Sequence, residues 1–118
     1  MTPEEKLYAV LNGIPALSGR VFPDVAPFET QVPYASYQRF GGVPVVFVDR
    51  AAPSLINCFF QIKVWSNSRI AAAQLIESVE TALRAALDIR AWPMSGAEAE
   101  HEDDLNLYGF RQDFNVWG

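Results

Sequence analysis

A regular alternation of apolar and other side chains begins at position 56, near the middle of the chain. A period of two is typical of a β-strand with two unlike faces. The face expected to point into the core consists of Ile56, Cys58, Phe60, Ile62 and Val64. The other face consists of Asn57, Phe59, Gln61, Lys63 and Trp65. Its two large aromatic residues, Phe59 and Trp65, are more than a solvated strand face usually carries.

A helical period replaces the alternation directly after this strand. Ser66, Asn67 and Ser68 offer side-chain oxygens for a helix start, and neither glycine nor proline follows until Pro93. Apolar residues then recur on one side of a helical projection, namely Ala72, Leu75, Ile76, Val79, Ala82, Leu83, Ala86 and Leu87. The pattern predicts a long amphipathic helix over about 68–87, packed across the core face of the preceding strand.

The N-terminal third predicts a short helix followed by a long loop. Thr2 and Glu5 have the spacing of a capping box and Pro3 suits the first helical turn, so a helix is expected over about 3–12. Four prolines between positions 15 and 33 then predict an extended loop over 14–32, with Val21 and Phe22 pinning it to the core. A loop of this length in a small domain is more often functional or partner-facing than idle.

Two β-rich runs, 34–40 and 43–48, flank Gly41-Gly42 and predict a hairpin. The second run, VPVVFV, is apolar on both faces and contains Pro44, which favours a sheet edge. An apolar edge strand exposed to water promotes association. The run is therefore covered either by its own chain or by another subunit, and the shortness of the chain favours another subunit.

The C-terminal third predicts a brief strand, a loop and a final strand. Residues 91–95 are expected to form a short strand carrying Trp92, and the acidic residues that follow indicate a mobile loop over 96–104. Alternation returns over 107–117, which predicts a last strand locked into the sheet. The whole pattern predicts a single α+β domain spanning 1–118, with a mostly antiparallel sheet of four to five strands and both helices packed on one side.

Composition and charge narrow the classes of function. A chain of 118 residues fits one domain that needs neither a disulfide nor a metal for stability. The start of the chain has no signal-peptide pattern and no window is apolar enough to span a bilayer, so a cytoplasmic, non-membrane protein is expected. Five of the fourteen acidic residues are Glu98, Glu100, Glu102, Asp103 and Asp104. The absence of a basic stripe argues against sequence-specific nucleic-acid binding.

The residues capable of catalysis do not form a recognisable site. The single histidine, His101, lies among carboxylates, but adjacent ligands on a flexible loop are not preorganised for metal binding or acid–base catalysis. The single cysteine, Cys58, lies on the core face of its strand, which favours a buried hydrophobic role over a reactive thiol. No catalytic, cofactor-binding or metal-binding residue is therefore predicted, and the chain is not expected to be an enzyme.

Aromatic and apolar side chains exceed what one small core requires, and interfaces are enriched in such residues. We predict a subunit or partner interface formed by Val45, Phe47, Phe59, Trp65, Trp92 and Trp117. Each of these residues taken alone is equally compatible with a place in the core.

Four segments in this order resemble the short tail-completion, or tail-terminator, proteins of tailed phages and prophages. They are MTPEEKLYAVLN, VPYASYQRFGG, FFQIKVWSNSRIAAAQLIESVETALRAAL and LYGFRQDFNVW, which together span nearly the whole chain. The chain carries Asp49-Arg50-Ala51-Ala52-Pro53 where the family usually has a glycine- or aspartate-rich turn. The resemblance is to proteins similar to the lambda tail terminator, which have a small α+β domain.

The resemblance implies a homo-hexameric ring that caps the tail tube, ends its polymerisation and offers a surface for head joining. The implied partners are further copies of the chain, the major tail tube protein and head–tail connector proteins, in the host cytoplasm during assembly and then in the virion tail. The five clustered acids would line the lumen of such a ring and repel DNA. Two other interpretations are a small oligomeric ligand-binding or regulatory α+β module and a hydrolase that uses the acidic loop.

Overall fold

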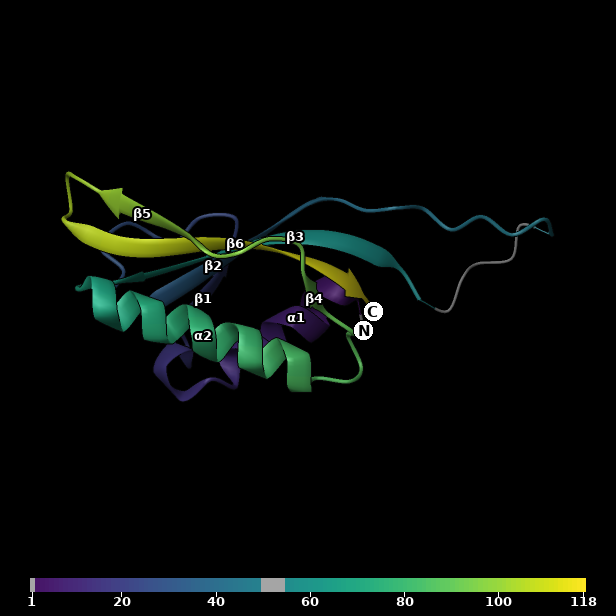
Figure 1. Cartoon of the computed structure of the whole chain (residues 1–118), viewed down its shortest axis with the longest axis horizontal. Helices are drawn as coiled ribbons and strands as arrows, with labels where there is room; N and C mark the ends of the chain where they lie inside the picture. Colours follow the sequence, from purple (N-terminus) through teal and green to yellow (C-terminus); the bar gives the residue numbers. More distant parts are fainter. Residues whose placement is uncertain (1, 50–54) are drawn as a thin grey trace.

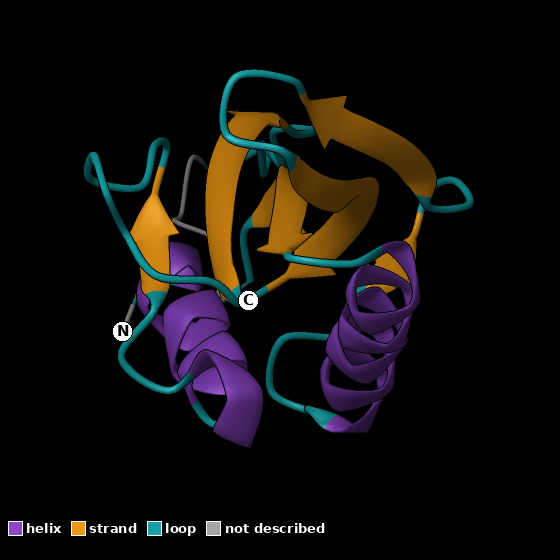
Figure 2. Ribbon diagram, turned by 90° about the vertical axis from the view of Figure 1, so that its left-hand side faces the viewer, coloured by secondary structure: helices purple, strands orange, loops and turns teal. Residues whose placement is uncertain are grey.

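The alternating segment that begins at position 56 forms the central strand of the sheet. A computed structural model describes residues 2–49 and 55–118 and contains the helices α1 (Pro3–Asn12) and α2 (Arg69–Ala85). A 3-10 turn, η1 (Pro15–Leu17), follows α1. The strands are β1 (Val21–Pro23), β2 (Tyr34–Gly41), β3 (Asn57–Ser66), β4 (Trp92–Pro93), β5 (Glu98–Glu102) and β6 (Leu107–Trp117). Both helices lie on one face of the sheet, which confirms the predicted α+β class (Figures 1 and 2).

The sheet is mixed and has six strands, one more than the upper end of the prediction. Its order is β1-β2-β3-β6-β4, and β5 pairs with β6 beside β4. Only β1 and β2 run parallel, and the other pairs are antiparallel. β3 pairs with β6 along its whole length, from Asn57 opposite Trp117 to Ser66 opposite Tyr108, and Phe60 lies opposite Phe114.

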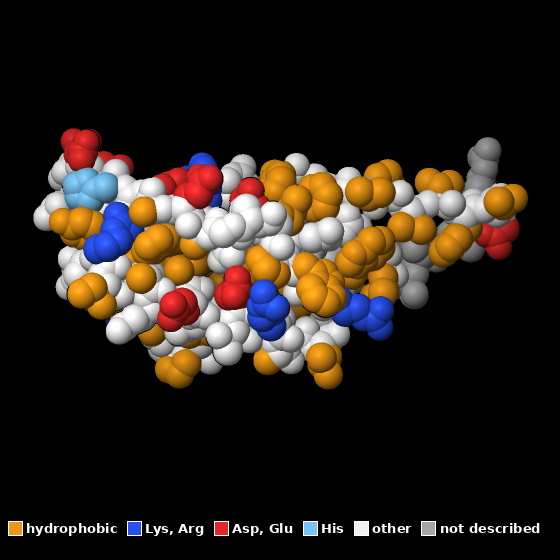
Figure 3. All heavy atoms as spheres, viewed as in Figure 1, with side chains coloured by type: hydrophobic (Ala, Val, Ile, Leu, Met, Phe, Trp, Pro, Cys, Tyr) orange, Lys and Arg blue, Asp and Glu red, His pale blue; other side chains and the backbone are white. Residues whose placement is uncertain are grey.

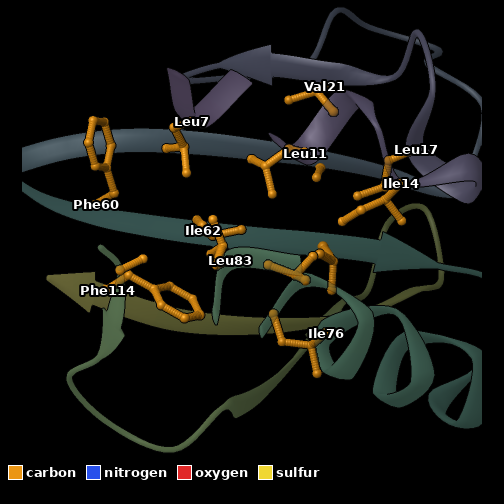
Figure 4. Packing of buried hydrophobic residues seen from close by; sticks show 14 of the residues in the cluster. Leu7, Leu11, Ile14, Leu17, Val21, Phe60, Ile62, Ile76, Leu83 and Phe114 are labelled. Carbon is orange, nitrogen blue, oxygen red and sulfur yellow. The ribbon is translucent and has the colours of Figure 1, made fainter. Parts of the chain in front are cut away.

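The core lies between the sheet and the two helices. Cys58, Phe60, Ile62 and Val64 on β3 are all fully buried, as their alternation predicts. Figure 4 shows Phe60 and Ile62 among leucines and isoleucines from the helices and from the segment after α1, and all four β3 residues belong to this cluster. Ile56, expected in the same row, is 45% exposed because it precedes the region that the helices cover.

Local capping explains where the helices begin and end. The Thr2 hydroxyl accepts from the Glu5 N–H at 3.2 Å and the Glu5 carboxylate accepts from the Thr2 N–H at 3.2 Å, forming the predicted capping box. Ser68 caps α2 by accepting from the Ala71 N–H at 3.1 Å. α2 ends at Ala85, two residues before the predicted end, because Ala86 takes an extended conformation.

Leu87 therefore does not join the core, and the prediction that placed it there is wrong. It lies beyond the helix end and is 84% exposed.

The predicted hairpin between 34–40 and 43–48 is wrong. β2 pairs instead with β3, and residues 43–47 belong to no strand. Gly41 and Gly42 have φ values of 139° and 156°, but they lead the chain away from the sheet. A Cβ atom on Gly42 would lie 2.2 Å from the Asn57 carbonyl oxygen, so this close approach requires glycine. Of the segment 49–53 that departs from the family's usual turn, all but Asp49 lies outside the described residues.

Two segments predicted as loops contain regular structure. The proline-rich segment 14–32 includes η1 and β1, and Val21 anchors it in the core as predicted. The acidic segment predicted as a mobile loop includes β5, which forms a hairpin with β6. Alternation of Glu98, Glu100 and Glu102 with Ala99 and His101 is the strand signal that the charge of this segment concealed.

Candidate interaction surfaces

Residues 42–49, which we call the arm, leave the end of β2 and project from the body of the protein (Figure 1). Val43 is 57% exposed, Val46 82% and Phe47 45%, while Val48 is fully exposed. Val45 is partly buried and lines a small hollow at the base of the arm. Apolar side chains thus run along a segment that its own chain leaves largely uncovered (Figure 3).

Asn57 fixes the base of the arm to the sheet. Its side-chain oxygen accepts from the Val43 N–H at 2.8 Å, and its amide donates to the Val116 carbonyl at 3.2 Å and to the Asn115 side-chain oxygen. Because Asn57 is only 5% exposed, these bonds satisfy a buried polar group. The arm therefore has a defined point and direction of departure.

A second apolar surface, which we call the tryptophan pocket, lies where the C-terminal end of α2, β4 and the end of β6 meet. It has a volume of about 530 Å³ and is lined by Leu55, Arg84, Ala86, Leu87, Arg90, Ala91, Trp92 and Trp117. Trp92 is 61% exposed and Trp117 is partly buried. The structure thus brings together two tryptophans that are 25 positions apart in the sequence.

The other two predicted interface aromatics lie on the sheet face opposite the helices and are partly buried by their own chain. Phe59 packs against Phe40 with ring centroids 5.8 Å apart. Trp65 lies over Gly109 of β6, where a Cβ atom would come within 2.6 Å of the indole ring. These contacts stabilise the sheet and leave only part of each ring available to a partner.

The acidic strand β5 is paired with cations from its own sheet. Glu98 and Glu100 both form ion pairs with Arg111, and Glu100 also lies 3.8 Å from the Lys63 ammonium. The hydrogen bond that Arg111 donates to the Glu98 carboxylate, together with the negative charge of Glu98, raises the pKa of Arg111. Asp103 and Asp104 lie at the exposed turn after β5, at the end of the body opposite the arm (Figure 1). The charge of the five acids is therefore partly neutralised along the strand and concentrated at its tip.

Arg69, at the start of α2, ties the β5–β6 hairpin to the helix layer. Its guanidinium donates to the Gly109 carbonyl at 2.7 Å and to the Glu100 carbonyl at 2.8 Å. The same group lies 5.3 Å from the ring centroid of Tyr108 and 4.9 Å from that of Phe110. These contacts join the hairpin to the start of α2.

The two candidate catalytic residues are not brought together. Cys58 is fully buried on β3, and desolvation raises the pKa of its thiol. His101 is exposed on β5, where hydrogen bonds from its ring to Asn106 at 3.0 Å and to Asp103 at 2.9 Å raise its pKa. The residues 2–49 and 55–118 contain no cluster of three metal-ligating side chains. No helix in these ranges combines the length and apolarity needed to cross a bilayer.

A third apolar surface was not identified from the sequence. Val25 is 79% exposed, Phe28 86% and Leu105 59%. Phe28 and Leu105 line one hollow beside the loop that precedes β2. The only sequence signal was the length of the proline-rich loop, which pointed to a partner-facing role without selecting these residues.

Exposed apolar surfaces of this kind are typical of proteins that bind other proteins. The model of one protein family, tail completion protein gp17, matches residues 5–117, which is nearly the whole chain. The chain belongs to this family, as the resemblance implied, and is a structural protein of the phage tail that contacts other tail or head proteins. No curated protein matches the chain.

Proposed function

We propose that this protein assembles into a homo-hexameric ring at the end of the phage tail tube. In that position it ends polymerisation of the tube and presents the surface to which the head is joined. Membership of the tail-completion family supports a role at the tail, and the uncovered apolar arm supports assembly with further copies. The arm is the single structural feature on which the ring proposal depends most.

A closed ring requires two different complementary surfaces on each subunit. The arm, with Val45 and Phe47, provides the first surface. Trp92 and Trp117 in the tryptophan pocket are candidates for the second, together with the exposed parts of Phe59 and Trp65. Burial of each large apolar side chain contributes about 1.5–3 kcal/mol, so a few such contacts per subunit suffice to drive assembly.

The partners of the ring are the major tail tube protein on one side and head–tail connector proteins on the other, first in the host cytoplasm and then in the virion. We place Glu98, Glu100, Glu102, Asp103 and Asp104 towards the lumen. Their negative charge would repel DNA phosphates during passage. A density map of the assembled tail with these residues on the outer rim would contradict this placement.

Virions produced without this protein provide the test of function. Loss of termination predicts overlong tails without attached heads in negative-stain images, and supplying the intact gene in trans should restore virions of normal length. Tails of normal length carrying heads would contradict the proposal.

The substitution Phe47→Asp tests whether the arm mediates assembly. Phe47 projects from the body, so the variant should fold normally but fail to form rings, because a carboxylate cannot enter an apolar contact without a large desolvation cost. Ser18→Asp, at an exposed loop position away from the arm, is the matched control and should assemble normally. Size measurement by analytical ultracentrifugation and folding by circular dichroism separate the two effects. Rings formed by folded Phe47→Asp would show that the arm is not the contact.

A further inference from the structure

We infer that the arm of one copy docks in the tryptophan pocket of a second copy. The inference rests on the proposed ring and specifies which two surfaces meet in it. Three properties of the described residues support this pairing, namely the state of the arm, the lining of the pocket and the distance between them.

Residues 43–48 of the arm form no helix or strand, and their side chains other than that of Val45 are exposed. Residues 43–48 carry no charge, and within the described part of the chain the backbone of residues 44–48 makes no hydrogen bond. Pro44 restricts one backbone torsion, which lowers the entropy lost when the segment is immobilised. The arm therefore has apolar side chains and backbone groups that a partner can bind, with one torsion already restricted at Pro44.

The tryptophan pocket has the complementary chemistry. Most of its lining is apolar, and Trp92 and Leu87 are largely exposed in the isolated subunit. Arg84 and Arg90 are the charged residues of the lining. An apolar centre with a polar margin is typical of a protein interface, and tryptophan is among the residues that contribute most to binding.

The reach of the arm fits contact between two copies. Six extended residues span about 20 Å, which is close to the 24–25 Å width of the molecule. The arm and the C-terminal end of α2, beside the pocket, lie at the same end of the body, and the arm runs away from the body (Figure 1). Leu87 and Trp92 of the pocket therefore stay exposed in the isolated subunit. Because the two surfaces differ, repeating the contact from copy to copy generates a ring when the rotation closes.

Cross-linking between copies tests the contact directly. Two variants of the whole chain are prepared, one with Val46→Cys and the other with Leu87→Cys. The two proteins are mixed and treated with a short bismaleimide. The native Cys58 is fully buried and should stay unreacted. The matched control replaces Leu87→Cys by Ile70→Cys, because Ile70 is an apolar residue, 73% exposed, at the N-terminal end of α2, whereas Leu87 follows the C-terminal end of that helix. We expect the Val46–Leu87 dimer to form at least ten times faster than the Val46–Ile70 dimer.

Each other outcome overturns the inference in a distinct way. Equal rates for both pairs would show that the cross-links arise from random collision. An oligomer without the Val46–Leu87 link would reject the pocket while leaving the ring intact. A protein that stays monomeric at the highest attainable concentration would reject docking between free copies, and the tail phenotype would then decide the proposed function separately.

Leu87→Asp provides an independent measurement. Because Leu87 is outside the helix and exposed, the variant should fold as well as Ile70→Asp. We expect Leu87→Asp to reduce the assembled fraction at least tenfold, as Phe47→Asp does, and Ile70→Asp to leave it unchanged. Normal assembly of Leu87→Asp would overturn the inference.

Discussion

Two apolar segments that lie close together in the sequence differ in burial. Residues 58–64 of β3 place Cys58, Phe60, Ile62 and Val64 in the core with no exposure, whereas the arm leaves Val46 and Val48 almost entirely in solvent. The two segments share valine and phenylalanine but differ in pattern. In β3 the buried residues alternate with Phe59, Gln61 and Lys63, whereas residues 43–48 of the arm are apolar throughout. An unbroken apolar run outside the core thus indicates a surface that requires a partner.

The largest expected difference between the two segments is in thiol reactivity. Cys58 is buried and its pKa is raised by desolvation, so labelling requires a large opening of β3, whereas a thiol introduced by Val46→Cys is accessible in the free subunit. An opening that costs at least 4 kcal/mol corresponds to labelling about 10³ times slower. Mass-spectrometric labelling kinetics of the Val46→Cys variant, at concentrations where it is monomeric, measure both rates. Comparable rates would show that β3 is not the rigid centre of the fold.

Truncation of one phenylalanine in each segment should give the next largest difference. Phe60→Ala should lower the free energy of unfolding by about 3–5 kcal/mol because it leaves a cavity beside Phe114. Phe47→Ala should change it by less than about 0.5 kcal/mol in the free subunit. Urea unfolding of both variants gives the comparison. A similar loss in both would mean that the arm packs against its own body in solution.

The base of the arm should be sensitive to a single methyl group. Gly42→Ala should destabilise the protein by about 1–3 kcal/mol, since the added Cβ would collide with the Asn57 carbonyl. Gly96→Ala is the control, because a Cβ there meets no atom within 4 Å and the stability should change by less than about 0.5 kcal/mol. Thermal unfolding of the two variants tests whether the backbone at Gly42 stays close to Asn57 in solution. Equal unfolding midpoints would show that it does not.

The smallest expected effect is the change of stability with the protonation of His101, which lies at the end of the body opposite the arm. Hydrogen bonds to Asn106 and Asp103 raise the pKa of His101 above its ordinary value of 6.5. Its contribution to stability is therefore fully present below pH 6.5 and is lost as the pH rises through the higher pKa of the folded protein. An NMR titration should show a lower pKa in Asp103→Asn and an unchanged one in Phe47→Asp. A changed His101 pKa in Phe47→Asp would show that the arm affects the opposite end of the protein, contrary to its separation from the body.

Much of the fold follows from local pattern. The period-two rows of β3 and β6 and the capping signals of Thr2 and Ser68 predict those elements because each signal is satisfied by nearby backbone or by one buried face. The hairpin at Gly41-Gly42 was predicted wrongly because glycine there serves a close approach to Asn57, a contact between residues far apart in sequence. β5 was missed because its strand pattern consists of charges whose partners, Lys63 and Arg111, become neighbours only in the sheet.

The interface residues stay a prediction, but the sequence does show an excess of tryptophan and an apolar run. The structure leaves Phe47 of that run exposed. The pocket lined by Trp92 and Trp117 also includes residues that follow the end of α2. Leu87 is exposed because α2 ends two residues before it, which the sequence pattern did not predict. The patch around Phe28 carries no periodic signal, so only the folded loop displays it.

The outer strands of the sheet bear on how large an assembly can grow. β1 has three residues and ends in Pro23, β4 has two and contains Pro93, and β5 carries three glutamates in five positions. Short length, proline and charge each discourage a sheet from adding strands from another molecule without limit. Edges of this kind disfavour a fibre that grows by adding strands to the sheet, so contacts between copies are left to the apolar surfaces outside the sheet edges.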